Sequence, residues 1–168
     1  MGDQKIDVLL AKQEITEVIY RYCRAMDRMD HDLAVAVWHP DGTASYEDVF
    51  EGTGAEFVDF VEKLHAERFV IHSHQVTNLL IEVDGDRAAS ESYLTVALRT
   101  KPEEGHGELQ ARGRYVDRWS RRDGRWALDH RIYVHDMSEM RTIGPPYLAG
   151  HLSQRGRGDV SYDYLGGS

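Results

Sequence analysis

The first thirty residues carry apolar side chains at the spacing of an α-helix. Steps of three and four positions link Val8, Ile15, Ile19, Tyr22, Met26 and Met29, with Lys12 in the one gap. This period predicts a helix with one buried stripe. Two further helices are predicted, over residues 30–39 with Asp30 or Asp32 near the N-cap, and over residues 54–67. The apolar side of the last one carries Phe57, Phe60, Val61 and Leu64.

From residue 69 onward the period changes to two, which is typical of strands. Residues 69–100 and 109–137 each predict a strand pair, joined by Asp84-Gly85-Asp86 and by Asp123-Gly124. Pro40-Asp41-Gly42 predicts a turn into an earlier strand, and residues 47–54 predict a hairpin. Helices followed by long antiparallel strands indicate an α+β fold. A curved sheet with helices on its concave side would enclose a conical pocket.

Composition places the chain among ordinary globular proteins. Its 168 residues, 41% of them hydrophobic, suit one domain, which we assign to residues 1–143. The tail, residues 144–168, is rich in glycine and proline and is either a lid, a subunit contact or a frayed end. The net charge of −9 argues against nucleic-acid and membrane partners. The start of the chain lacks a signal-peptide pattern and Cys23 is a single cysteine, so we expect a cytoplasmic protein.

Histidines interrupt the apolar pattern of the first long strand. Alternation places His72, His74 and Asn78 on one face among aliphatic residues. Buried polar groups need partners, so these side chains either satisfy each other or form part of a site. Asp27 lies at the end of the first helix, where the helix dipole disfavours a carboxylate. It could cap the following turn, pair with a neighbouring arginine, or join the two histidines around a metal.

Two other residues are candidates with less certain orientation. Tyr22 lies on the apolar stripe and Asp27 at its edge, so both face one cavity only if the helix bends or the cavity wraps around it. Arg131 shares a strand face with Ala127, Asp129, Tyr133 and His135, either as an edge charge or as an inward anion anchor. Cys23 is disfavoured as a nucleophile because the charge of Asp27, four residues on, would raise the pKa of its thiol.

Three segments together resemble one known family. These are residues 14–46 (EITEVIYRYCRAMDRMDHDLAVAVWHPDGTASY), 72–88 (HSHQVTNLLIEVDGDRA) and 113–133 (GRYVDRWSRRDGRWALDHRIY). In order and spacing they resemble the SnoaL-like branch of the NTF2-like superfamily, over roughly residues 5–137. Their motifs look closest to scytalone dehydratase, hexachlorocyclohexane dehydrochlorinase and bile-acid 7α-dehydratase. The resemblance implies a cone-shaped α+β barrel in which the first helix bends over the pocket mouth.

The resemblance also implies roles for individual residues. Asp27 and His74 correspond to a catalytic dyad, Tyr22 to a proton donor and Arg131 to the holder of a carboxylate or oxyanion. The substrate would be bound by His72, Asn78, Tyr46, Trp38, Phe57 and Tyr115. Where the dehydrochlorinase carries lysine this chain has Tyr22, which makes a halide leaving group less expected.

The function that follows from the resemblance is a lyase that needs no cofactor and no metal. It would eliminate water from a hydrophobic cyclic or aromatic small molecule, as part of aromatic-compound catabolism. A formaldehyde-releasing retro-aldol lyase of lignin fragments, an isomerase or cyclase, and a non-catalytic small subunit of a ring-hydroxylating dioxygenase remain alternatives. Relatives form homodimers or homotrimers. Trp119, Trp126 and Tyr133 are candidates for contacts through the sheet face, although core packing is the commoner role of such aromatics.

Overall fold

The computed structural model describes residues 2–101, 107–144 and 153–165, with side chains from residue 4 onward. Its helices are α1 (Gly2–Arg28), α2 (His31–Ala36), α3 (Gly54–Arg68) and α4 (Ser161–Leu165), with a 3₁₀ turn, η2, at Gly156–Gly158. Its strands are β1 (Trp38–Ser45), β2 (Glu51–Thr53), β3 (Phe69–Asp84), β4 (Arg87–Thr100), β5 (Gly107–Arg122) and β6 (Arg125–Thr142).

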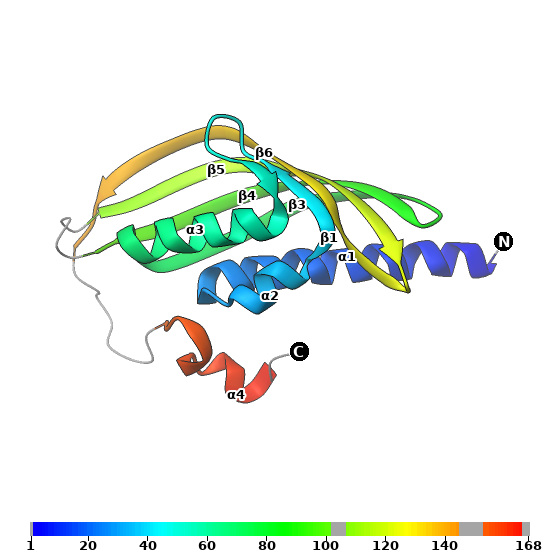
Figure 1. Ribbon diagram of the computed structural model, residues 1–168, viewed down its shortest axis with the longest axis horizontal. Helices are drawn as coiled ribbons and strands as arrows, with labels where there is room; N and C mark the ends of the chain where they lie inside the picture. The colour runs from blue at the N-terminus through cyan, green and yellow to red at the C-terminus, as the bar shows by residue number, and fades with distance from the viewer. Residues whose placement is uncertain (1, 102–106, 145–152, 166–168) are drawn as a thin grey trace.

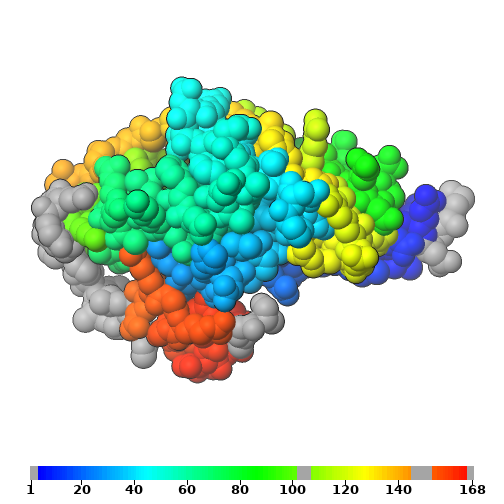
Figure 2. All heavy atoms as spheres, in the orientation of Figure 1, coloured from blue at the N-terminus to red at the C-terminus, as the bar shows by residue number. Residues whose placement is uncertain are grey.

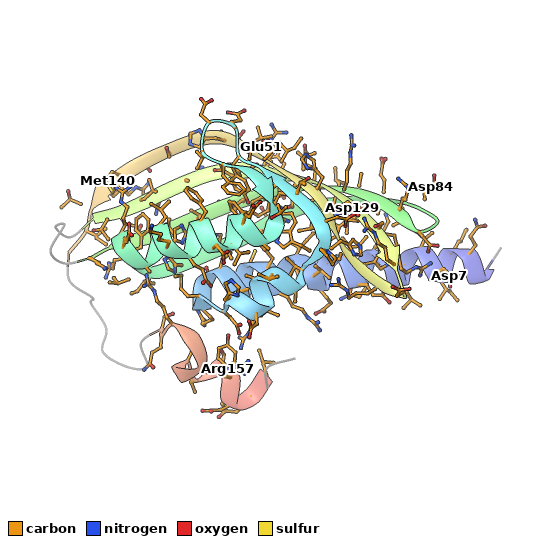
Figure 3. All side chains as sticks on the ribbon, in the orientation of Figure 1. Asp7, Glu51, Asp84, Asp129, Met140 and Arg157 are labelled. Carbon is orange, nitrogen blue, oxygen red and sulfur yellow. The ribbon has the colours of Figure 1, made fainter. Side chains whose placement is uncertain are left out.

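The six strands form one sheet in the order β2-β1-β6-β5-β4-β3. Every neighbouring pair is antiparallel except β1 and β6, which run parallel. The sheet is curved and open, and α1 and α3 lie on its concave side, as Figure 1 shows. The predicted α+β architecture is therefore confirmed, and the interior is the space between this face and the helices, which side chains fill (Figure 3).

The helix α1 buries a wider stripe than its periodicity predicts. Ile15, Ile19, Tyr22 and Met26 are buried as predicted, and Ala11 rather than Lys12 fills the gap before them; Cys23 and Ala25 are buried as well. The helix is continuous from Gly2 to Arg28. Two sides of α1 can face the interior without a kink in the helix, because the curved sheet contacts it through both β3 and β6.

The helices α2 and α3 each begin at a residue whose side chain caps the helix N-terminus. Asp30 is the N-cap of α2, with its Oδ1 accepting from the Leu33 amide at 3.2 Å. Thr53 and Glu56 form a capping box at the start of α3. The buried side of α3 differs from the prediction: Val58 and His65 are buried with Phe57, whereas Phe60 is 37% exposed. The buried stripe of α3 is rotated about the helix axis relative to the predicted one, because α3 packs against β1 and β2 as well as β3.

The predicted hairpins are confirmed, and one predicted turn is wrong. Gly85, Asp123 and Gly124 take positive φ angles of 59°, 52° and 77°, as tight turns between antiparallel strands require. Pro40-Asp41-Gly42 does not form a turn before the strand, because β1 already begins at Trp38 and passes through it. The pairing register of β1 with β6 shifts between Trp38 and Thr43, so the irregularity is a bulge within the strand.

Bulges also overturn two predicted strand faces. In β3 the register shifts between Thr77 and Leu80, and Asn78 has a φ of 47°. Asn78 and Leu80 are consequently exposed, and the prediction that Asn78 shares the inner face with His74 is wrong. In β6 a register shift makes Leu128 the partner of Trp119 and Arg131 the partner of Asp117. Leu128 and Arg131, which simple alternation places on opposite faces, therefore share the side of Trp119 and Asp117, and both are buried.

The C-terminal segment, residues 153–165, packs on the side of the helices that faces away from the sheet (Figures 1 and 2). Asp159 pairs with Arg28 at 3.2 Å, and the Tyr162 hydroxyl donates to Asp30 at 2.5 Å. Residues 145–152 and 166–168 of the predicted tail lie outside the described part of the chain. Within that part no helix is long and apolar enough to cross a membrane.

Candidate functional site

Asp27 and His74 meet where the C-terminal end of α1 crosses β3. The Oδ1 of Asp27 lies 2.6 Å from Nδ1 of the His74 ring. The same carboxylate accepts the His74 backbone amide, at 2.9 Å to Oδ1 and 3.1 Å to Oδ2. These bonds offset the unfavourable position of a carboxylate at a helix C-terminus. Both side chains are largely enclosed, with 17% of Asp27 and 8% of His74 exposed.

This contact determines which ring nitrogen is free. A carboxylate accepts hydrogen bonds, so Nδ1 of His74 carries the proton and Nε2 has a free lone pair. Among the residues that the structure describes, none forms a hydrogen bond with Nε2. The pair is therefore arranged as an oriented base, in which Asp27 would also stabilise the imidazolium that forms on protonation.

A second cluster surrounds Arg131 on β6. Its guanidinium forms a bidentate pair with Asp117 of β5, at 2.7 Å and 2.8 Å, and both side chains are fully buried. The guanidinium carbon lies 3.9 Å from the Tyr115 ring centre and 4.4 Å from that of Tyr22. Burial opposes the charge, but Asp117 keeps the pKa of Arg131 well above its ordinary value. The Nη1 of Arg131 is buried and has no hydrogen-bond partner among the described residues.

The phenols beside Arg131 are paired with each other. The hydroxyls of Tyr22 and Tyr46 lie 3.3 Å apart, and either can donate. Burial raises the pKa of Tyr22, while the charge of Arg131 partly opposes this. The pKa of Tyr46 is raised well above its ordinary value, again chiefly by burial. Both side chains are therefore neutral phenols near neutral pH, and so are hydrogen-bond donors.

An aromatic row continues from this pair. The Tyr46 ring stacks on Phe57 at 4.2 Å and on Tyr133 at 5.3 Å, and Tyr133 lies 6.1 Å from Tyr115. A Cβ on Gly113 would come within 2.7 Å of the Tyr133 ring, so glycine at this position makes room for that ring. Tyr133 thus lies on the inner face, and Trp119 and Trp126 are buried in the core. Core packing, the commoner role expected of such aromatics, is therefore what the structure shows for Trp119 and Trp126.

The thiol of Cys23 is affected by a charge from each of the two clusters. Burial raises the pKa of its thiol to about 12, with Arg131 lowering it and Asp27 raising it. The direction agrees with the expectation from Asp27, although burial is the larger cause. Tyr22, which contacts Arg131, and Asp27 of the dyad both belong to α1, so this helix carries a member of each cluster.

Of the predicted substrate-binding residues, His72 and Asn78 point away from the aromatic row, and Trp38 is buried in the core. The His72 ring stacks on His65 at 4.7 Å, and its Nε2 lies 3.4 Å from Nη2 of Arg155. Because His72 and His74 face different neighbours, they do not converge on one metal, and no group of three ligand side chains occurs in the described part of the chain. Asn78 is exposed at its bulge. Trp38 is buried, 6.0 Å from Arg131.

Sequence reasoning missed Asp117, Tyr133 as an inner residue, and His65. Asp117 alternates with Tyr115 and Trp119, so the pattern of β5 already placed a carboxylate on an apolar face. Its pairing with Arg131 depends on the bulge in β6, for which the sequence carries no clear signal. His65 was hidden because it lies at the end of α3, where the predicted apolar stripe was rotated.

Comparisons with known proteins agree with this architecture. A hexachlorocyclohexane dehydrochlorinase (LinA type 3) from Novosphingobium barchaimii superposes with a TM-score of 0.75 at 20% identity, covering 84% of this chain and 99% of that one. A putative scytalone dehydratase from Novosphingobium aromaticivorans gives 0.72 at 22% identity, covering 89% and 100%. A Mycobacterium tuberculosis protein of unknown function gives 0.65 at 29%, covering 80% and 75%.

A search of curated proteins found no match. A family model described as a SnoaL-like domain matches residues 7–132, which include the dyad, the tyrosine pair and Arg131. This match covers most of the chain and agrees with the helices and the curved sheet described above. The chain therefore belongs to the SnoaL-like domain family.

Proposed function

We propose that the protein is a cofactor-independent lyase of the dehydratase type, acting on a hydrophobic cyclic or aromatic small molecule. The observation that carries this proposal is the 2.6 Å contact between Asp27 and Nδ1 of His74, with the carboxylate also fixed by the His74 amide. An oriented, neutral imidazole with a free Nε2 is a general base for proton removal. Dehydrochlorinase and scytalone dehydratase among the similar folds make elimination the reaction class to test first.

In this proposal Nε2 of His74 takes a proton from a carbon of the substrate. The electron pair of that C–H bond forms the new double bond, while the bond to the neighbouring oxygen breaks. The departing oxygen takes a proton from the Tyr22–Tyr46 pair, whose raised pKa values keep both phenols protonated. Arg131 would stabilise an oxyanion through Nη1, the one guanidinium nitrogen that Asp117 does not occupy.

The aromatic row beside the tyrosine pair is compatible with a substrate of this class. Phe57, Tyr46, Tyr133 and Tyr115 follow each other at ring distances of 4.2–6.1 Å. Aromatic faces of this kind suit planar or cyclic molecules, which stack against them. His72 and Asn78 take no part in binding in this proposal, because the structure directs them away from the aromatic row.

The test begins with a panel of hydroxylated cyclic and aromatic compounds and the wild-type protein. With a compound that turns over, Asp27→Asn and His74→Gln are each expected to lower kcat on the order of 10²–10⁴-fold. Asp84→Asn, in the exposed β3–β4 turn, is the matched control and keeps wild-type activity. Near-wild-type turnover by both dyad variants, with unchanged circular dichroism, would overturn the proposal.

Product masses distinguish the reactions that begin with the same proton removal. Loss of the mass of water supports the dehydratase. Loss of the mass of formaldehyde indicates a retro-aldol lyase, and an unchanged mass indicates an isomerase or cyclase. Since all three need the oriented base, the dyad variants test the site and the product tests the reaction.

A further inference from the structure

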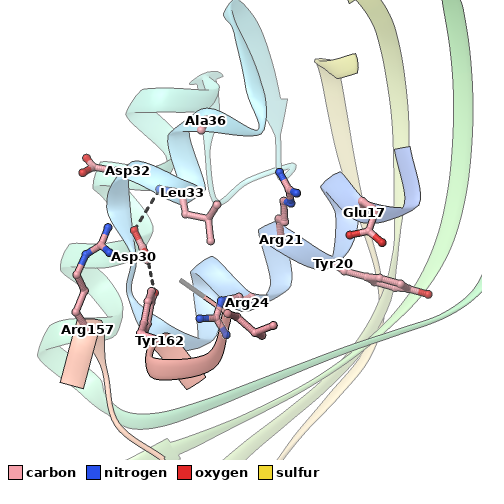
Figure 4. A pocket seen from close by; sticks show the side chains of 11 residues that line it. Glu17, Tyr20, Arg21, Arg24, Asp30, Asp32, Leu33, Ala36, Arg157 and Tyr162 are labelled. Carbon is pink, nitrogen blue, oxygen red and sulfur yellow. Dashed lines mark hydrogen bonds between the residues drawn. The ribbon is translucent and has the colours of Figure 1, made fainter. Parts of the chain in front are cut away.

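A groove of about 500 Å³ lies between α1, α2 and the C-terminal segment (Figure 4). None of its lining residues belongs to a strand, so it is separate from the dyad and the aromatic row inside the sheet. It is lined by Glu17, Tyr20, Arg21, Arg24, Asp30, Asp32, Leu33, Ala36, Arg157, Tyr162 and Leu165. This volume is in the range that holds a small organic ligand.

Three arginines surround the groove without a carboxylate partner. In Figure 4, Arg157 and Arg21 stand on opposite sides and Arg24 lies between them. Arg24 donates to the Ser161 hydroxyl at 2.9 Å and lies 4.5 Å over the Tyr162 ring. Arg157 lies 5.5 Å over the same ring. Within the described residues none of the three has a carboxylate oxygen within 4.0 Å, so none of them forms an ion pair there.

The acidic residues of the groove are already engaged or point to solvent. Both oxygens of Asp30 accept hydrogen bonds, from the Leu33 amide and the Tyr162 hydroxyl. The side chain of Asp32 is 96% exposed and lies 3.7 Å from His31. Glu17 accepts from Gln13 at 3.2 Å. None of these carboxylates forms an ion pair with the three arginines in the described part of the chain, so the guanidinium groups keep donors for an incoming anion.

The remaining surface of the groove is apolar and exposed. Tyr20 is 53% exposed and Leu165 64%, and Leu33 and Ala36 continue this surface on α2. Apolar side chains left open beside unpaired guanidiniums fit a ligand with both kinds of group. We infer that this groove binds a carboxylate-bearing small molecule with an apolar body, contacted by Arg21 and Arg157 at the anion and by Tyr20 and Leu33 along the body.

The test uses two fluorescent probes of similar shape that differ in charge. Anilinonaphthalene sulfonate carries an anion on an aromatic body, and N-phenyl-naphthylamine is its neutral counterpart. Wild-type protein is expected to bind the sulfonate with a Kd below about 1 mM and at least about tenfold more tightly than the neutral probe, as one charge-assisted hydrogen bond provides. Tyr20→Ser is expected to weaken both probes.

The variants Arg21→Gln and Arg157→Gln are expected to weaken the sulfonate about tenfold each and leave the neutral probe unchanged. Arg118→Gln, which removes the same charge from an exposed position on β5, is the matched control and changes neither. Absence of sulfonate binding, binding insensitive to both groove variants, or an equal loss in the control would each overturn the inference. None of these outcomes depends on turnover. The test of ligand binding in the groove is therefore independent of the proposed lyase activity.

Discussion

At the scale of single residues, the Arg131–Asp117 pair is the most costly feature of the interior. Two fully buried charges lose their hydration, and only their bidentate contact and the rings of Tyr22 and Tyr115 compensate for it. A pair of well-packed apolar residues would serve stability equally well. In the proposed site, this pair would hold Arg131 in a fixed orientation with Nη1 free.

Breaking this pair is expected to destabilise the protein strongly. Asp117→Leu leaves an unpaired guanidinium in the core, and the expected loss is about 3–5 kcal/mol in the free energy of unfolding, measured by urea denaturation. The double variant Asp117→Leu/Arg131→Met removes both charges and should recover most of that loss. Asp41→Asn, which breaks the exposed pair with Arg122, is the control and should leave the unfolding midpoint unchanged. A small effect of Asp117→Leu alone would mean that water reaches Arg131.

At the scale of elements, the junction of α3 and β3 gathers three polar side chains. His65 lies in the last turn of α3, His72 follows on β3, and Arg155 of the C-terminal segment donates to the carbonyls of His65 and Phe69. The His65 carbonyl also accepts from the Phe69 amide, so Arg155 adds a second donor and a positive charge at the C-terminal end of the helix. Burial lowers the pKa of His65 to about 4 and that of His72 to about 3, and Arg155 adds to both shifts.

These lowered pKa values predict the direction in which stability depends on pH. The unfolded chain binds protons at the ordinary histidine pKa of 6.5, and the folded chain only near 4 and 3. The contribution to stability is therefore complete above pH 6.5 and is lost as pH falls toward 3. In the variant His65→Phe/His72→Phe the stacked rings remain but cannot titrate, so the unfolding midpoint should fall less between pH 6.5 and 4. His135→Gln is the exposed control, and equal slopes in wild type and the double variant would contradict the prediction.

The elements themselves were predictable to the extent that they follow a period. The steps of α1 and the alternation of β3 to β6, with Asp-Gly turns, located every long element within a few residues. The bulges at Asn78, in β1 and in β6 were not predictable, because one extra residue leaves composition and period almost unchanged. The register shift between Thr77 and Leu80 explains why Asn78 was misplaced. His74 lies in the uninterrupted stretch from Ile71 to Thr77 and contacts Asp27.

At the scale of the whole molecule, three layers follow each other: the sheet, the helices and the C-terminal segment (Figure 1). The first two layers follow from hydrophobic pattern and family resemblance. The third layer is held by separate polar contacts with Arg24, Arg28 and Asp30, and the hydrophobic periodicity of the sequence does not predict such contacts. The arrangement of the sheet with α1 and α3 was therefore predictable, and the place of residues 153–165 was not.

A chain that ends at Gly144 tests what the third layer contributes. It loses Arg155 at the end of α3, Asp159 at Arg28 and Tyr162 at Asp30, so the unfolding midpoint should fall. Amide exchange should accelerate in the last turns of α1 and α3, because their terminal groups become accessible to water, and remain unchanged in β4 and β5. Arg155→Gln in the full chain is the matched variant, with an effect confined to α3. Equal midpoints and exchange rates in the truncated and full chains would show that the segment does not stabilise the helices. Faster exchange in the sheet as well would show that the third layer supports the whole fold and not only the helix ends beneath it.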